Sequence, residues 1–441
     1  MLSTETRQAI IGLVHQQVVP AIGCTEPICV ALATAKATER LGCTPQKITA
    51  HLSANILKNA MGVGIPGTGM VGLPIAIALG ALVGKSQYGL EVLRDSNAEW
   101  VERGKAFIAE GRINISLATD DDFAARGIDP TEKLFVDIIV EADDKTATAT
   151  IAHLHTNFVD SSQKIAPAKE AIASDAAPAE PVKGIGAELT LRLVYDFAHT
   201  TPLEEIEVIN EAGRLNMEAA RQSLEHNYGH CLGKAMHRPL GRGIMGDTIF
   251  SHVLMATSSA CDARMAGAMI PVMSNSGSGN QGICATNPVM AFARENHNTH
   301  EETTRALMLS HLTAIYIKQH LGSLSALCGC IVASTGSSCG ITYLMGGDYD
   351  HIVAAVKNMI ANLTGMICDG AKPSCALKLT SGVSMAILSA MLSMQGECVT
   401  SVEGIIDDDV DRSIRNLATI GANAMNETDR CVLDIMTHKS C

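Results

Sequence analysis

The hydrophobic positions of this chain change their spacing twice. Near the beginning, Ile10, Leu13, Val14 and Val18 fall on one face of a helix that should stop at Pro20. The spacing predicts a second helix over residues 28–39 and a third, apolar on all sides, over residues 73–83. The chain therefore begins with helical segments, one of which should be fully buried.

Alternation replaces the helical spacing in the next part of the chain. Ile113, Ile115 and Leu117 alternate with polar residues, and Val136, Ile138 and Val140 recur with the same period. Asp143-Asp144-Lys145 can turn the chain into the threonines of 146–150. A period of two residues is typical of strands with one buried face. We expect residues 136–150 to form an antiparallel hairpin.

A proline- and glycine-containing stretch over residues 174–186 reads as a linker, and the pattern after Ala187 is almost wholly helical. A chain of 441 residues is long enough for two folding units. The predicted fold class is α+β. A smaller mixed region with antiparallel strands occupies 1–175, and a larger, mainly helical region that holds the candidate cluster site occupies 187–441.

The charge and its distribution along the chain argue against several classes of partner and location. The net charge is −13 and no Lys/Arg-rich run is present, which argues against nucleic acid and anionic lipid as partners. Residues 59–84 lack charged side chains, but Pro66, Pro74 and several glycines interrupt them, so we expect no membrane span. No basic, then apolar, leader begins the chain, which predicts a cytoplasmic protein. A homodimer is the default expectation for a soluble oligomer.

The cytoplasmic expectation changes how the 14 cysteines are interpreted, because metal binding or catalysis is then favoured over disulfides. Zinc-finger and ferredoxin spacings are absent. Cys368 and Cys375 flank a loop, and with a distant third thiol they could bind three corners of a cubane and leave one iron open. Spacing alone leaves open that these thiols are ordinary buried side chains. Cys24 lies in the Gly23–Pro27 bend before a helix, where the dipole favours a thiolate.

Two glycine-rich stretches are candidate binding loops. Residues 67–72 match the dinucleotide fingerprint in form, but no strand precedes them, so close backbone packing is the better interpretation. Residues 273–282 alternate glycine with hydroxyl and amide side chains between apolar segments, a composition suited to holding a carboxylate or phosphate. A solvated surface loop is the alternative. The candidates here are Ser274, Asn275, Ser276 and Asn280.

Several long motifs are spread along the chain. They are Gly23–Pro27, Pro66–Pro74, Asp262–Met265, Ser274–Gly282, Leu324–Cys328 and Met366–Gly370. Together they resemble one family, the L-cysteine desulfidases, which are relatives of the bacterial iron–sulfur L-serine dehydratase α chains. The resemblance spans roughly residues 8 to 436.

The resemblance implies a [4Fe–4S] cluster held by Cys328, Cys368 and Cys375, with Cys330 beside the motif rather than in it. It also implies that Cys24 is the base in a β-elimination of L-cysteine to sulfide, ammonia and pyruvate. A thiolate base requires a pKa lowered toward neutrality. Further candidates for gripping the substrate are Asn55, Lys58 and Asn59, whose alternative is simple helix polarity.

The sequence leaves other functions open. An iron–sulfur L-serine dehydratase would perform the same elimination with a hydroxyl leaving group. A pyridoxal-phosphate enzyme would need a Schiff-base lysine, for which Lys58 is the candidate. A non-catalytic iron–sulfur protein should have a partner-binding or basic DNA-binding element, and none is evident. A cysteine-rich structural protein is a further alternative. Cys441, the last residue, could fold back and cap the open iron.

Overall fold

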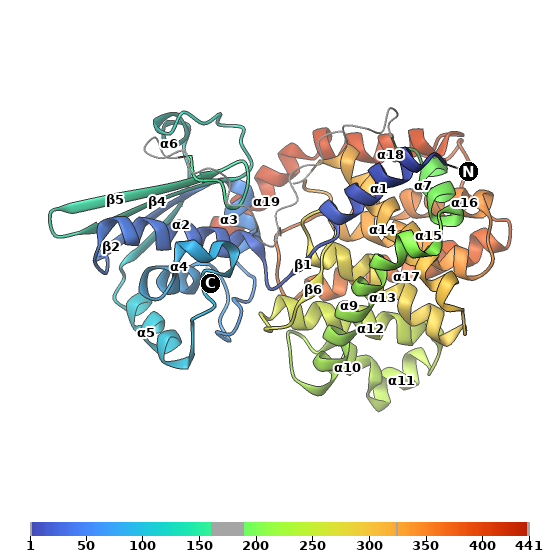
Figure 1. The fold of residues 1–441 in the computed structure, drawn as a ribbon, viewed down its shortest axis with the longest axis horizontal. Helices are drawn as coiled ribbons and strands as arrows, with labels where there is room; N and C mark the ends of the chain where they lie inside the picture. Colours follow the sequence, from blue (N-terminus) through green and yellow to red (C-terminus); the bar gives the residue numbers. More distant parts are fainter. Residues whose placement is uncertain (1, 160–188, 323–324, 439–441) are drawn as a thin grey trace.

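The computed structural model describes residues 2–159, 189–322 and 325–438. It has two lobes (Figure 1): one contains a β-sheet with helices, and the other is made almost wholly of helices. This is the α+β architecture that the sequence predicts. The predicted linker over 174–186 falls outside the described residues, and the division between 1–175 and 187–441 stays a prediction.

The sheet of the first lobe has the strand order β3-β2-β4-β5. Strands β4 and β5 form the predicted antiparallel hairpin, with Val136 opposite Ile151 and Val140 opposite Ala147. Strand β2 pairs antiparallel with β4 and parallel with β3, and the parallel pair was not predicted. The strands are β2 (Lys47–Leu52), β3 (Ile113–Leu117), β4 (Phe135–Ala142) and β5 (Lys145–Ala152).

Helix α2 packs along β4 and β5, and the wholly apolar α4 packs against α2. These buried side chains form a core that is separate from the core of the helical lobe. The helical segments of this lobe are α2 (Thr25–Leu41), α3 (Ala54–Ala60), α4 (Leu73–Leu82), η1 (Ser86–Glu91), α5 (Ala98–Ala109) and α6 (Asp120–Ala125).

The second lobe is built around α14 and α15, which lie side by side. Each is buried along nearly its whole length, and both cores contain few aromatic rings. The helices here are α7 (Leu191–Thr200), α8 (Leu203–Ile206), η2 (Glu207–Ile209), α9 (Asn210–Glu225), α10 (Leu232–His237), α11 (Pro239–Met245), α12 (Ile249–Met265), α13 (Gly279–Glu295), α14 (His300–Leu321), α15 (Gly329–Leu344), α16 (Tyr349–Leu363), α17 (Cys375–Met394), α18 (Val410–Thr419) and η3 (Ile420–Ala424).

The two ends of the chain cross between the lobes (Figure 1). Helix α1 (Thr4–Gln17) packs in the core of the helical lobe, and β1 (Pro20–Ala21) pairs there with β6 (Val272–Met273). Helix α19 (Asn426–His438) returns to α3, and its Leu433 joins the core of the sheet lobe. The lobes are therefore connected at both ends of the described chain.

One helix in the described ranges, α17, is long and apolar enough by length and composition to cross a bilayer. It packs against α12, α15 and α16, as a core helix does. The uncharged stretch over residues 59–84 forms the end of α3, a glycine-rich turn and α4.

Gly336 allows the close approach of α14 and α15, because a Cβ there would overlap the carbonyl oxygen of Ser310. We expect Gly336→Ala to lower the free energy of unfolding by about 1–3 kcal/mol, as overpacking does. Gly12, on the exposed side of α1, has nothing within 4 Å of such a Cβ. Gly12→Ala is the control and should stabilise the protein by about 0.5–1 kcal/mol. Denaturant unfolding of both variants tests this, and equal effects would contradict it.

Candidate active site at the junction of the two lobes

Cys24 lies where the chain passes from the helical lobe to the sheet lobe. It is the N-cap residue of α2 and is 4% exposed. Its thiol donates a hydrogen bond to Oε2 of Glu26, with an Sγ–O distance of 2.9 Å. The other carboxylate oxygen, Oε1, accepts a hydrogen bond of 3.2 Å from Nδ2 of Asn59 on α3. The predicted base therefore has a carboxylate as its direct partner.

The electrostatics of this pair differ from the expectation. Burial, and then the charge of Glu26, raise the pKa of Cys24 well above its usual range, while Arg264 opposes them. Burial on its own would raise the pKa of Glu26, but the charge of His155, the bond from Cys24 and Arg264 lower it below its usual value. The expectation of a lowered Cys24 pKa is wrong for the resting protein. The helix N-terminus is outweighed, and the proton rests on sulfur.

Arg264 links Cys24 to the polar loop. It lies on α12, is 7% exposed, and donates one hydrogen bond to the carbonyl of Gly23 and one to Oδ1 of Asn280, at 3.2 and 3.0 Å. Its Nε has no hydrogen-bond partner in the described part of the chain. Gly279 packs so closely on this guanidinium that a Cβ there would overlap it. The structure thus brings Asn280 to the Cys24 side of the site.

The other residues of the polar loop bind protein groups. The Ser274 hydroxyl donates to the carbonyl of Val19 at 2.7 Å, and the Asn275 amide donates to the carbonyl of His311 at 3.1 Å. Ser276, with a positive φ of 49°, donates its hydroxyl to Oδ1 of Asn275. These contacts tie the loop to the β1 segment and to α14. They account for Ser274 and Asn275 without a ligand, so a substrate-binding role for the pair stays a prediction.

The structure brings together Cys328, Cys368 and Cys375. Residues 327 and 367 form an antiparallel bridge, in which the Cys328 amide donates to Met366 at 2.9 Å and the Cys368 amide donates to Ala326 at 2.6 Å. Cys328 is the N-cap of α15, and Cys375 is the first residue of α17. Two helix N-termini and one loop therefore present these thiols.

The charges of these thiols act on one another. The bond to Cys330 and burial raise the pKa of Cys328, and burial together with the Cys328 charge raises the pKa of Cys368 and of Cys375. Thiols whose negative charge raises the pKa of a neighbouring thiol are a donor set that suits a strongly positive group. In the described ranges, no three His, Cys, Asp or Glu side chains could hold a single metal ion. A cubane binds each thiolate to a different iron, so the set fits a cluster better than a single ion.

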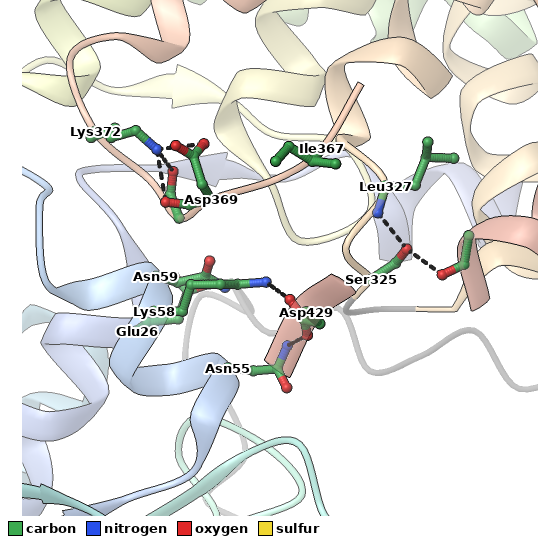
Figure 2. A network of polar contacts seen from close by, with 12 residues as sticks. Glu26, Asn55, Lys58, Asn59, Ser325, Leu327, Ile367, Asp369, Lys372 and Asp429 are labelled. Atoms are coloured by element: carbon green, nitrogen blue, oxygen red, sulfur yellow. Dashed lines mark hydrogen bonds and ion pairs between the residues drawn. The ribbon is translucent and has the colours of Figure 1, made fainter. Parts of the chain in front are cut away.

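Lys58 and Asn55 on α3 face the C-terminal helix (Figure 2). Lys58 is 2% exposed and forms an ion pair with Asp429 of α19, which also accepts a 3.3 Å hydrogen bond from Asn55. Gly370 lies against the carbonyl of Lys58 so closely that a Cβ would overlap it. Helix α3 thus connects the Cys24 pair, through Asn59, with the loop that joins Cys368 to Cys375.

Sequence reasoning missed several residues of the site. Glu26 and Arg264 are parts of motifs that were recognised, but nothing in the sequence showed that they meet. Asp429 gave no signal because its partner is far away in the chain. Lys318, on α14, is also buried; burial lowers its pKa to about 8 against the charges of Cys368 and Cys328.

The fold and site define a two-lobed α+β protein with a thiol-rich centre at the junction of the lobes. The chain belongs to the serine dehydratase alpha chain family, whose sequence pattern matches residues 87–434. This membership assigns it to the dehydratase or lyase class of enzyme. The match covers the three thiols and the polar loop, but Cys24, Glu26 and α3 precede it.

Three relatives that match this chain over nearly its whole length have a family label as their name. A UPF0597 protein of Bacteroides thetaiotaomicron is 63% identical over 441 residues, 100% of this chain and 99% of its own. A UPF0597 protein of Porphyromonas gingivalis is 51% identical over 99% of this chain and 100% of its own. One from Oleidesulfovibrio alaskensis is 44% identical over 97% of each chain. The similarity thus includes the N-terminal part that contains Cys24.

His311 supports the polar loop as a neutral ring, hydrogen-bonded to Asn275 and Thr286. Burial lowers its pKa from 6.5 to about 3. The unfolded chain takes up a proton below its own pKa whereas the folded protein does not, so stability should fall as the pH drops from about 6.5 toward 3. We expect His311→Gln to lose less stability than the parent over this range, by up to about 1.4 kcal/mol per pH unit. Thermal unfolding at several pH values tests this, with exposed His226→Gln as the control.

Asp429 neutralises a buried lysine, so its loss should be costly. Asp429→Asn should lower the free energy of unfolding by about 3 kcal/mol and speed hydrogen exchange in α19. Replacing both partners, Lys58→Met with Asp429→Leu, should recover much of the loss. Arg430→Ala on the same helix breaks only an exposed ion pair with Glu427 and should have little effect. Equal effects of Asp429→Asn and Arg430→Ala would contradict the assignment.

Proposed function

We propose that this protein is a [4Fe–4S]-dependent lyase that eliminates hydrogen sulfide from L-cysteine, with Cys24 as the proton-abstracting base. The observation that supports it is the convergence of three cluster-type thiols with the Cys24–Glu26 pair across the lobe junction, through α3. The family supports the reaction class, since serine dehydratases also remove a β-substituent from an amino acid. The choice of L-cysteine is the finer part of the proposal.

Cys328, Cys368 and Cys375 would hold the cluster. When bound, it supplies a thiophilic Lewis-acidic iron, which suits a sulfur leaving group. Assembly must release protons, because the pKa of every one of the three thiols is raised in the protein. Cluster loading should therefore be favoured by higher pH.

The residues of this chain perform the proton transfer and the positioning. The α-hydrogen of an amino acid is a very weak acid, so a base must lie close to it in a water-poor site. Cys24, 4% exposed at the start of α2, meets the second condition. Removal of the α-proton and departure of sulfide leave aminoacrylate, which hydrolyses to pyruvate and ammonia without further help.

Asn280 and Ser276 are our candidates for holding the substrate, because Arg264 ties Asn280 to the Cys24 loop. Lys58 and Asn55 are engaged with Asp429, and could hold a substrate carboxylate only by exchanging that partner. The same ion pair argues against a Schiff-base role for Lys58, since the Nζ atom that would bond to a carbonyl carbon is held by the Asp429 carboxylate.

An iron–sulfur L-serine dehydratase is the second candidate, favoured by the family name itself. The two reactions use the same residues and differ in the departing atom. Of the remaining expectations, a cytoplasmic location and a homodimer belong to this proposal. Cys441 lies outside the described residues, and capping of the open iron by its thiol stays a prediction.

The test is anaerobic reconstitution with iron and sulfide, followed by assays of sulfide and pyruvate release. We expect an iron–sulfur visible band, and a higher kcat/KM for L-cysteine than for L-serine. Cys368→Ala should lose the band and turnover, whereas Cys339→Ala, which removes a buried thiol elsewhere on α15, should retain both. A higher kcat/KM for L-serine would favour the dehydratase. Full activity without iron would remove the cluster assignment.

A further inference from the structure

In the described part of the chain, the Glu26 carboxylate is the anionic hydrogen-bond partner of the Cys24 thiol, and the geometry suits proton exchange. The distance from Sγ to Oε2 of Glu26 is 2.9 Å, which is short for a hydrogen bond from sulfur. Asn59 holds Oε1 at 3.2 Å, and the Thr25 hydroxyl donates to Oε2 at 3.2 Å. Besides the thiol, two donors, one from α2 and one from α3, thus hold the carboxylate against Cys24.

The resting state of the pair poses a chemical problem for a thiolate base. The two groups hold one proton between them. This proton lies on sulfur, because burial and the Glu26 charge raise the pKa of Cys24 while the pKa of Glu26 is lowered. A protonated thiol cannot take a second proton. Cys24 can therefore act as a base only if its own proton moves first to an acceptor within hydrogen-bond reach.

We propose that Glu26 is this acceptor and forms a proton-sharing dyad with Cys24. The inference rests on the proposed function and assigns Glu26 as a positioning residue that acts through Cys24. In the first step the S–H bond breaks, the electron pair stays on sulfur, and an O–H bond forms at Oε2. The dyad keeps its single proton and its net charge of about −1 throughout this step.

The proton balance closes over one turnover. The Cys24 thiolate takes the α-proton of the substrate, so the dyad then holds two protons. The C–S bond breaks with its electron pair on the departing sulfur, and one proton from the dyad converts hydrosulfide into hydrogen sulfide. The dyad returns to one proton, with no outside acid or base required.

The charges around the dyad favour this exchange. Arg264 from α12 acts on both members, His155 from the segment after β5 acts on Glu26, and the N-terminus of α2 faces the thiol. Each favours an anion, so the dyad stays anionic whichever member holds the proton. A substrate ammonium beside it would add to the same effect.

Glu26→Gln separates this role from a structural one, because its two effects have opposite signs. Turnover of L-cysteine by the reconstituted enzyme should fall about 100-fold, since the proton acceptor is lost. Iodoacetamide should alkylate Cys24 about tenfold faster near neutral pH, because removing the Glu26 charge lowers the pKa of the thiol. Mass spectrometry of the Cys24 peptide measures the second effect without requiring the cluster.

Matched variants and the pH profile complete the test. Glu26→Asp should recover part of the turnover, and Thr25→Ala, which removes a neutral donor to the same oxygen, should lose far less than Glu26→Gln. The parent kcat/KM should fall at acid pH as Glu26 becomes protonated, and Glu26→Gln should lack this limb.

Two results would overturn the dyad. One is turnover by Glu26→Gln equal to that of the parent. The other is a decrease in both turnover and the rate of Cys24 alkylation in Glu26→Gln. If Cys24→Ser abolishes turnover while Glu26→Gln is fully active, only the Glu26 step fails. If Cys24→Ser is fully active, the proposed function of Cys24 fails with it.

Discussion

The contact of Gly370 with the carbonyl of Lys58 is the constraint on which the arrangement of the site depends. Gly370 has a φ of +87°, in the left-handed region, and any Cβ would overlap the Lys58 oxygen. Only glycine therefore lets the loop between Cys368 and Cys375 lie directly on α3. The same short helix holds Glu26 through Asn59, so one backbone contact sets the thiols of the helical lobe against the Cys24 side of the junction.

The charges at this junction are compensated locally. Lys58 is paired with Asp429, and Glu26 is stabilised by Arg264, His155 and the Cys24 thiol. Buried ions without such partners would cost several kcal/mol each. The three cluster-type thiols lack such compensation from one another, because the charge of Cys328 raises the pKa of Cys368 and of Cys375. This part of the site is therefore suited to accept positive charge, whereas the Cys24–Glu26 pair is suited to exchange a proton.

The crossing of the chain ends joins the two lobes at the site. Helix α1 packs in the helical lobe before the chain reaches Cys24, and α19 returns from that lobe to cover Lys58. The chain thus joins the two lobes once near its beginning, just before Cys24, and once near its end, at α19. A geometry built from two lobes needs this connection, because proton transfer depends on distances that small rotations would change.

The sequence by itself determined the elements and the residue types of the site. Apolar spacing located α1, α2 and α4, the two-residue period located the β4–β5 hairpin, and the motifs selected Cys24 and the three thiols. These signals are local, since period and turn chemistry act over a few residues. The tertiary structure alone decided which of these residues meet. The pairing of Lys58 with Asp429 joins α3, early in the chain, to α19, the last helix described. The parallel pairing of β2 with β3 spans intervening helices. The pKa of Cys24 was also beyond the sequence, because burial and the position of the Glu26 carboxylate, rather than the helix N-terminus, decide it. Contacts between distant segments depend on the packing of the whole chain, and no local pattern records them.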